Sequence, residues 1–389
     1  MSHTDVIGIV IQGECDPRFT AVREALERNF AERGEIGSAV AVYYRGEKVV
    51  DLWGGHLDAA RTRPWRADTL CLMYSIAKSM CALCVHILAD RGQVDLEAPV
   101  AAYWPEFAQN GKDAIRVRHI LSHNCGVCFA DAAAPGDIFN DDNMIRALAV
   151  QAPAWPVESK GAYNTVNIGY LAGEVVRRIT GQRIQDFLQE NVCRPLGAQY
   201  FLGVAEQDLA RCADLTPNPA GSTLAQAASN PDSPVARAWR PMPKGFGVAV
   251  QNSTVFRRAG VPSFGGFGEA RAMARIYAAL ANGGEIDGVR LLSPEAVARA
   301  TTLQWREEAD GMTGRPIRMA MGFWKNTPVH APMGPNPNAF GHPGSGGARA
   351  LADPDRNLAL CYVTNYQCER MSVGERPEAI VEAAFAGID

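Results

Sequence analysis

Segments with the composition of β-strands occupy both ends of the chain, and its middle has helical periodicity. Near the start, residues 38–44 (SAVAVYY) and 48–53 (KVVDLW) flank Arg45-Gly46-Glu47, which predicts an antiparallel hairpin with a short loop. Toward the end, strands are predicted in residues 320–325, 348–354 and 357–365. Because strands from both ends can share one sheet, we expect an α/β (α+β) fold with an antiparallel sheet flanked by helices and a second, mainly helical domain.

Several helices are predicted from apolar spacing and from the residues that begin and end them. Asp16-Pro17 has the pattern of a helix cap followed by proline, and helical spacing then continues to Gly34. Further helices are expected near residues 75–91, 142–151, 166–180, 184–193, 269–282 and 376–387. Three of them should end at a left-handed glycine, namely Gly92, Gly181 and Gly283.

The length of 389 residues corresponds to about two domains. We expect residues 1–70 and 285–389 to form a discontinuous α/β domain and residues 71–284 to form the helical domain. Residues 214–245 are rich in proline and asparagine, which predicts an irregular surface connection.

Composition excludes several classes of function. The chain has 38 lysines and arginines against 42 aspartates and glutamates, a net charge of −4, which argues against a nucleic-acid partner. No apolar run is long enough to cross a membrane, and the first 16 residues lack the basic start of a signal peptide, so a cytoplasmic protein is expected. Ten cysteines are too few for a disulfide scaffold, and we expect mainly buried thiols. The oligomeric state is not indicated.

The most informative motif is Ser75-Ile76-Ala77-Lys78, at the point where a strand-like segment gives way to a helix. Three residues are about one helical turn, so the Ser75 hydroxyl and the Lys78 amine should share one face. A serine attacks a carbonyl only when a base takes its proton, and lysine can do so when burial lowers its pKa. The pair therefore predicts a nucleophile and its base, although a capped, solvated helix start is the simpler interpretation of the motif alone.

Two further motifs support the catalytic interpretation. Tyr163 precedes a predicted helix, and we expect a cationic Lys78 nearby to lower the pKa of its phenol so that it can act as a base. His342-Pro343-Gly344-Ser345-Gly346-Gly347 precedes a strand, and its glycines leave room for a carbonyl substrate to approach the backbone N–H groups.

In this order and spacing, the three motifs resemble those of the serine β-lactamase and penicillin-binding-protein superfamily, and most closely its class C-like esterase branch, the family VIII carboxylesterases. The resemblance implies a site in the cleft between the two domains, with no cofactor and no metal. It implies that Ser75 is the acylated nucleophile and that Lys78 and Tyr163 share the base and proton-shuttle roles. The backbone N–H groups of Ser75 and Ser345 would form the oxyanion hole, with His342 and Gly344 beside the substrate.

Two departures from the class C pattern bear on the substrate. The tyrosine motif reads Tyr163-Asn164-Thr165, so Thr165 stands where class C enzymes have an asparagine amide. His342 stands where they have a lysine, and a neutral histidine is a weaker partner for the carboxylate of a β-lactam. We therefore expect a small-molecule ester with a short acyl chain as the substrate, with weak or no β-lactamase activity.

Other interpretations stay open at this stage. An amidase, a D-amino-peptide hydrolase or an acyltransferase could use the same residues, and a non-catalytic binding protein could keep them unused. Two C-x-x-C pairs and two nearby histidines could form a zinc site: Cys81, Cys84, Cys125, Cys128, His119 and His123. We favour the alternative in which the thiols pack in the core and the HILSHN segment has a structural role. Ser345 is disfavoured as a nucleophile because Pro343 stands where the motif G-x-S-x-G requires a glycine. Separately, the glycine-rich residues 265–268 are expected to form a turn. Five aromatic residues are candidates for either the pocket or the core: Trp155, Trp239, Phe264, Phe267 and Trp324.

Overall fold

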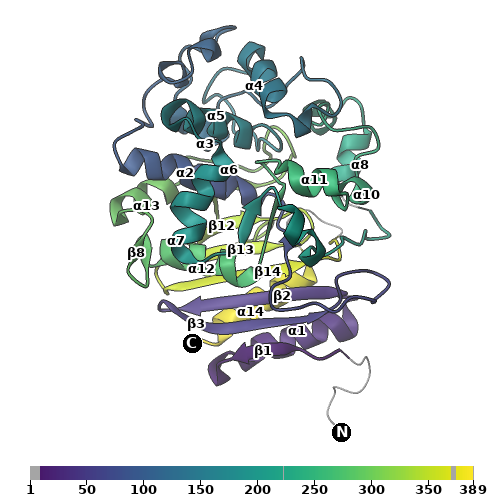
Figure 1. Cartoon of the computed structure of the whole chain (residues 1–389). Coiled ribbons are helices and arrows are strands. Elements are labelled where there is room, and N and C mark those ends of the chain that lie inside the picture. The colour runs from purple at the N-terminus through teal and green to yellow at the C-terminus, as the bar shows by residue number, and fades with distance from the viewer. Residues whose placement is uncertain (1–8, 222, 369–373, 389) are drawn as a thin grey trace.

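The computed structural model describes residues 9–221, 223–368 and 374–388. Its centre is a nine-stranded antiparallel sheet in the order β1-β3-β2-β14-β13-β12-β11-β10-β9 (Figure 1). Strands from the two ends of the chain meet where β2 pairs with β14, with Val40 opposite Tyr362. The strands are β1 (Gln12–Cys15), β2 (Gly37–Tyr44), β3 (Glu47–Gly55), β9 (Trp305–Glu307), β10 (Ile317–Met319), β11 (Trp324–Lys325), β12 (Phe340–Pro343), β13 (Arg349–Asp353) and β14 (Leu358–Thr364). This confirms the predicted sheet built from both termini.

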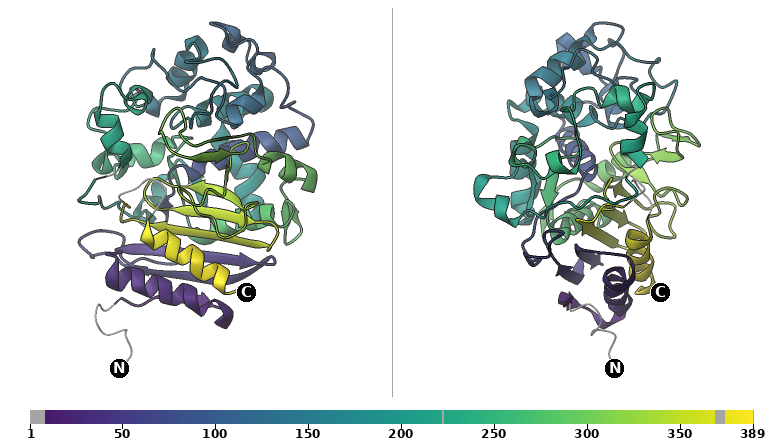
Figure 2. Two further views of the ribbon diagram at one scale, coloured as in Figure 1. Left: turned by 180° about the vertical axis from the view of Figure 1, so that it is seen from behind. Right: turned by 90° about the vertical axis from the view of Figure 1, so that its right-hand side faces the viewer.

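Both faces of the sheet are covered by helices. Along β14, Leu358, Leu360 and Tyr362 belong to one apolar cluster, which includes side chains of α1 (Thr20–Glu32) and α14 (Glu375–Ala386). The alternate residues of β14 belong to the other cluster, which includes α12 (Ala270–Ala281). Because successive side chains of a strand point to opposite faces, every residue of β14 is buried. Figure 2 shows α1 and α14 side by side on the outer face of the sheet.

A large helical region lies on the other side of the sheet (Figure 1). Its helices are α2 (Ile76–Asp90), α3 (Val117–Leu121), α4 (Asp141–Val150), α5 (Ile168–Thr180), α6 (Ile184–Leu188), α7 (Arg194–Leu196), α8 (Thr223–Ser229), α9 (Pro234–Ala238), α10 (Val248–Gln251), α11 (Thr254–Ala259) and α13 (Pro294–Thr301). One three-stranded sheet contains β4 (Cys71–Leu72), β6 (Gly266–Gly268) and β5 (Tyr200–Leu202), and β7 (Glu285–Ile286) pairs with β8 (Val289–Arg290). Short 3-10 turns occur at Pro17–Phe19, Val100–Ala102, Pro105–Ala108, Asp137–Phe139 and Glu206–Arg211, and a π-turn at Gln189–Cys193.

Most local expectations are confirmed. The hairpin forms, and Gly92, Gly181 and Gly283 have φ angles of 71°, 75° and 70°, as left-handed helix ends require. Two expectations were wrong. Residues 214–245 contain the short helices α8 and α9, and residues 266–268 form the strand β6 rather than a turn. A Cβ on Gly266 would lie 1.9 Å from the Tyr200 hydroxyl, so close packing explains this glycine.

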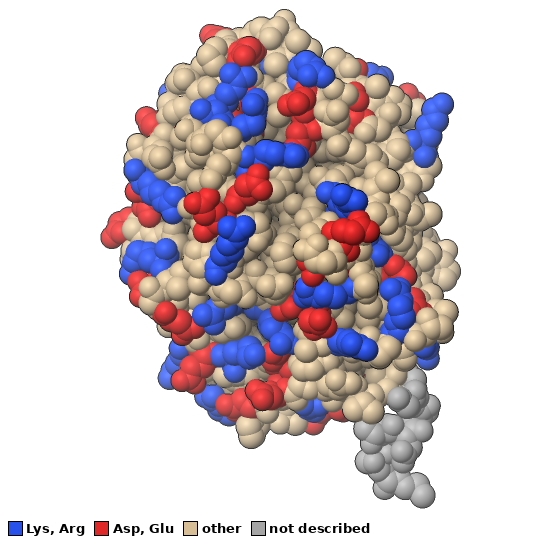
Figure 3. All heavy atoms as spheres, in the orientation of Figure 1, with Lys and Arg blue, Asp and Glu red and all other residues tan. Residues whose placement is uncertain are grey.

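The proposed domain limits stay a prediction. Helix α12 falls inside the range assigned to the helical domain, yet it packs on the sheet against β2, β13 and β14. Among the described residues, no helix has the length and apolar character needed to cross a membrane. The N-terminal segment, on which the expectation of no signal peptide rests, includes residues 1–8, which lie outside the described residues. The cytoplasmic location stays a prediction. The face in Figure 3 carries both signs of charge interspersed.

Candidate active site

Ser75 lies at the N-terminus of helix α2, the most deeply buried helix around the site. Every residue from Ile76 to Leu88 is buried, so α2 is surrounded by protein on all sides over this range. The preceding residue, Tyr74, has a φ of +50°, which is uncommon for a bulky residue and turns the chain sharply from β4 into the helix. Ser75 itself stays partly exposed and faces a pocket.

The amine of Lys78 is held beside the hydroxyl of Ser75. The distance from Lys78 Nζ to Ser75 Oγ is 3.1 Å, and Nζ also donates a 2.9 Å hydrogen bond to the backbone carbonyl of Ser263. Complete burial lowers the pKa of Lys78 to about 7, because a charged amine is costly away from water. The amine is thus partly neutral near pH 7 and can accept a proton.

Tyr163 completes the cluster from a loop before helix α5. Tyr163 and Ser75 line the same pocket, and Lys78 Nζ lies 5.2 Å from the centre of the Tyr163 ring. Trp324 packs edge-on against the same ring at 5.3 Å. Burial raises the pKa of Tyr163, and the neighbouring Ser75 side chain offsets this only in part. The expectation that Lys78 lowers this pKa was wrong, because the burial that neutralises the amine also disfavours a phenolate.

The segment His119–Asn124 supports the tyrosine loop, as expected for a structural role. His123 has a φ of 59°, and its Nδ1 accepts a 2.8 Å hydrogen bond from the backbone N–H of Asn164. Its ring stacks on Tyr163 with centroids 5.1 Å apart. His119 Nδ1 accepts from the backbone N–H of Arg116 at 3.0 Å and so caps helix α3.

The cysteines are also accounted for without a metal. Nine of the ten free cysteines are buried, and the thiol of Cys81 lies 3.1 Å from the carbonyl oxygen of Pro262. Within the described ranges, no group of three or more metal-ligating side chains is placed to hold an ion.

The glycine-rich loop after β12 packs directly on the chain that carries Ser75. A Cβ on Gly344 would lie 2.7 Å from the carbonyl oxygen of Met73, and one on Gly346 would lie 2.6 Å from the ring of Tyr74. Only glycine permits this approach, which brings Ser345 to the same pocket as Ser75.

His342 lies at the end of β12 and is 1% exposed. Its Nδ1 donates to the carbonyl of Pro343 at 2.8 Å, and its ring lies 5.9 Å from that of Tyr163. Burial and the nearby charge of Lys78 lower the pKa of His342 to about 3. His342 is therefore neutral at pH 7 and cannot supply the positive charge that a lysine would.

A small pocket of about 50 Å³ opens at Ser75. Its lining is neutral throughout and largely apolar: Tyr74, Ser75, Tyr163, Thr165, Val166, Trp239, Met242, Phe246, Gln251, Phe264 and Ser345. Of the aromatic candidates, Trp239 and Phe264 line it, whereas Phe267 is 1% exposed in the core and Trp324 packs behind Tyr163. Trp155 packs on Phe129 in a separate cluster.

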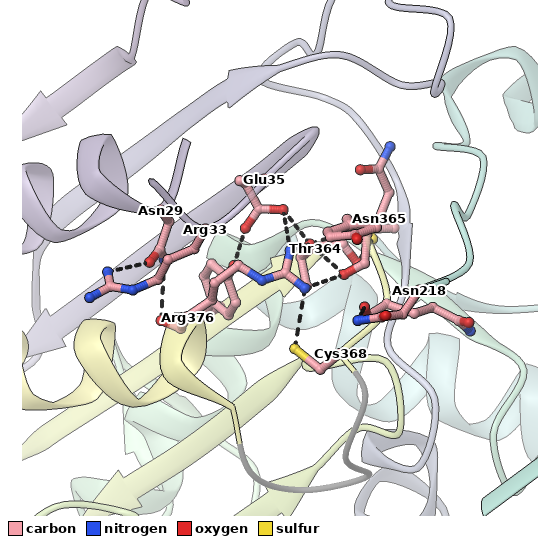
Figure 4. A network of polar contacts seen from close by, with 12 residues as sticks. Asn29, Arg33, Glu35, Asn218, Thr364, Asn365, Cys368 and Arg376 are labelled. Atoms are coloured by element: carbon pink, nitrogen blue, oxygen red, sulfur yellow. Dashed lines mark hydrogen bonds and ion pairs between the residues drawn. The ribbon is translucent and has the colours of Figure 1, made fainter. Parts of the chain in front are cut away.

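A buried polar network joins Arg376 of α14 to Glu35 and to the segment that follows β14 (Figure 4). Arg376 pairs with Glu35 at 2.9 Å and donates to the carbonyl of Tyr366 at 2.7 Å and the thiol of Cys368 at 3.3 Å. Gln367, between Tyr366 and Cys368, contacts the pocket lining directly, because its Nε2 donates a 2.5 Å hydrogen bond to the Tyr74 hydroxyl. The backbone N–H of Cys368 donates to the carbonyl of Gly346 at 3.1 Å. These contacts hold the Tyr74 and Gly346 segments, which pack on each other beside the pocket.

Sequence reasoning missed several of these residues. Met242, Phe246 and Gln251 lie in or near short helices without a periodic signal, and nothing in the pattern placed them at the pocket. Asp310 was also missed, although its carboxylate accepts a 2.9 Å hydrogen bond from the backbone N–H of Tyr163.

The sheet topology and the grouping of a pocket-lining serine with a buried lysine and tyrosine together define the class of serine β-lactamases and penicillin-binding proteins. The chain belongs to the beta-lactamase family, whose model matches residues 22–385.

Relatives and solved structures agree over nearly the whole chain. The chain is 35% identical over 368 residues to Esterase/beta-lactamase LipL of Mycobacterium tuberculosis, covering 91% of this chain and 82% of that protein. It is 26% identical to Esterase EstB of Burkholderia gladioli, over 91% and 92% of the two chains. A crystal structure of a family VIII carboxylesterase matches with a TM-score of 0.89 at 36% identity, over 97% of this chain and all of the other. A penicillin-binding protein homolog from Caulobacter crescentus matches with a TM-score of 0.88 at 38% identity, over 97% and 100%.

Proposed function

We propose that this protein is a serine carboxylesterase that hydrolyses small, uncharged esters of short-chain acids through an acyl-enzyme. The observation that carries the proposal is the placement of the Lys78 amine 3.1 Å from the Ser75 hydroxyl at the mouth of a neutral pocket. The similarity to LipL, EstB and a family VIII carboxylesterase supports ester chemistry.

In the proposed acylation step, Ser75 Oγ attacks the ester carbonyl carbon while its proton passes to the neutral amine of Lys78. The backbone N–H groups of Ser75 and Ser345 stabilise the oxyanion. The bond to the alcohol oxygen then breaks, and Tyr163, which lines the pocket with Ser75, relays the proton from Lys78 to the departing alkoxide.

In the second step, water attacks the acyl-enzyme with the same proton-transfer groups and releases the acid. The resting base in this proposal is Lys78 rather than Tyr163, since burial makes the amine easier to neutralise and the phenol harder to ionise. Coupled groups titrate together, so the pH dependence belongs to the cluster as a whole.

The preference for esters over β-lactams follows from charge. A β-lactam substrate carries a carboxylate, but none of the residues that line the described pocket is cationic, and His342 stays neutral above a pKa of about 3. An ester also has a better leaving group than an amide and needs less help from a proton donor.

The test is a panel of p-nitrophenyl acetate and butyrate, nitrocefin and a D-amino-acid p-nitroanilide. We expect turnover of the esters, at least about a hundredfold lower kcat/KM for the other two, and a loss of at least about a thousandfold in Ser75→Ala. Ser229→Ala is the matched control, and it should retain activity because Ser229 is exposed and lies outside the pocket lining. Full ester turnover by Ser75→Ala would refute the proposal.

A further inference from the structure

One amide group stands out in the lining of the active-site pocket. Gln251, the last residue of α10, contributes the single carboxamide among the lining residues, and its residue surface is 7% exposed. The other lining residues have hydroxyl, aromatic or aliphatic side chains. A buried amide in such surroundings needs hydrogen-bond partners.

The orientation of this amide follows from its neighbour Tyr74. The hydroxyl of Tyr74 accepts a hydrogen bond from Gln367 Nε2 at 2.5 Å, so its own proton is free to be donated elsewhere. The acceptor is Gln251 Oε1, 3.5 Å from the hydroxyl oxygen. The carbonyl end of the Gln251 amide is therefore turned toward Tyr74.

The other end of the amide has no protein partner. Oε1 makes the only hydrogen bond found for the Gln251 side chain among the described residues, and both N–H groups of Nε2 remain free. Although Nε2 has no partner, it is not among the atoms that are fully sealed from solvent. Gln251 is also one of the residues that line the pocket. Two N–H donors are thus available on a residue that lines the pocket at Ser75.

Thr165 does not offer the same chemistry. It lines the pocket but is 6% exposed, and its hydroxyl is shut off from solvent with no hydrogen-bond partner in the described residues. The amide that the tyrosine motif lacks is thus present in the pocket on a different segment of the chain.

We infer that Gln251 Nε2 donates a hydrogen bond to a second oxygen of the substrate, so that the enzyme selects uncharged esters bearing an additional carbonyl or ether oxygen in the acyl part. This inference rests on the proposed esterase function and names its substrate class. A substrate without that oxygen leaves the amide desolvated and unpaired, which lowers its kcat/KM.

The experiment compares two pairs of p-nitrophenyl esters of matched length: 4-oxopentanoate with pentanoate, and methoxyacetate with butanoate. Each rate is divided by the rate of hydroxide-catalysed hydrolysis of the same ester, which removes differences in intrinsic reactivity. We expect the unmodified enzyme to favour the oxygen-bearing member of at least one pair by about tenfold or more in corrected kcat/KM.

The same ratio is then measured in Gln251→Met, which keeps the size of the side chain but has no donor, and in Gln93→Met as a control on the exposed surface. The ratio should fall toward one in the first variant and stay unchanged in the second. Equal corrected rates within both pairs for the unmodified enzyme would overturn the inference even if Gln251→Met does not fold, as would an unchanged ratio in a folded Gln251→Met. Hydrolysis of none of the four esters would instead overturn the proposed function.

Discussion

The amine of Lys78 donates a 2.9 Å hydrogen bond to the backbone carbonyl oxygen of Ser263. That carbonyl is itself fixed, because the Ser263 hydroxyl accepts from the backbone N–H of Gly169 at 2.9 Å and donates to the carbonyl of Val166. Gly169 and Val166 lie just after the loop that carries Tyr163. Ser263 therefore joins the position of the amine to the position of the tyrosine loop, and the account of catalysis depends on this arrangement.

The first prediction concerns the pH dependence of ester hydrolysis. Because the pKa of Lys78 is lowered to about 7 and only the neutral amine can take the serine proton, kcat/KM should rise through pH 7 and level off above about pH 8. The measurement is kcat/KM for p-nitrophenyl acetate from pH 5 to 9. His342→Asn should keep the inflection near 7, because the pKa of His342 is about 3. A rate that keeps rising to pH 9 would mean that Lys78 titrates as an ordinary lysine.

The second prediction concerns stability. The pKa of Lys78 is lower in the folded protein than in the unfolded chain, so between about pH 7 and 10 the unfolded chain binds more protons and stability rises with pH. Below pH 7 the cost of the buried charge is fully present. Lys78→Met should therefore be inactive yet more stable at pH 6, by on the order of 1–3 kcal/mol, with the gain shrinking toward pH 10. Urea unfolding at the two pH values measures this, and a less stable variant at pH 6 contradicts it.

The third prediction separates positioning from charge at Asp310. Its Oδ1 accepts hydrogen bonds of 2.9 Å from the backbone N–H groups of both Tyr163 and Met312. Asp310→Ala should lower kcat for p-nitrophenyl acetate by about tenfold or more, because the tyrosine loop loses its anchor. Asp310→Asn keeps an oxygen acceptor at the same place and should restore most of the activity. Equal losses in the two variants would indicate that the negative charge, not the hydrogen bond, is what matters.

The fourth prediction concerns the buried pair of Glu35 and Arg376, whose side chains are 0% and 6% exposed. Arg376→Met leaves the carboxylate of Glu35 buried without its cation and should cost about 3–5 kcal/mol in the free energy of unfolding. The double variant Glu35→Leu/Arg376→Met should lose less than the sum of the two single changes. Arg258, in an exposed pair with Glu206, is the control, and Arg258→Met should change stability by less than about 1 kcal/mol. Urea unfolding that finds similar losses in Arg376→Met and Arg258→Met would refute this prediction.

The sequence predicted the features that depend on short, regular patterns. The hairpin around Gly46, the left-handed glycines and the Ser75–Lys78 spacing all follow from local backbone geometry. The role of Tyr163 came from the family resemblance and stays a prediction, and the structure places its ring 5.2 Å from Lys78 Nζ.

Features that depend on distant contacts were missed. Strand β1 is short and polar, and it exists because Gly13 fits against the edge of β3, where a Cβ would lie 1.9 Å from the carbonyl oxygen of Asp51. The orientation of Gln251 depends on Tyr74, which lies 177 residues away in the sequence. Tyr74 depends in turn on Gln367, which is 293 residues away from it. The pKa of Tyr163 was misjudged because its degree of burial is a property of the packed core and not of the motif.

The most direct test of the account is covalent labelling with a fluorophosphonate, followed by mass mapping of the modified peptide. We predict one adduct per chain, located on Ser75, formed faster at pH 8 than at pH 6 and lost in Ser75→Ala. An adduct on Ser345 or another serine, or no adduct on an enzyme that still hydrolyses esters, would contradict the central claim that Lys78 activates Ser75 as the nucleophile.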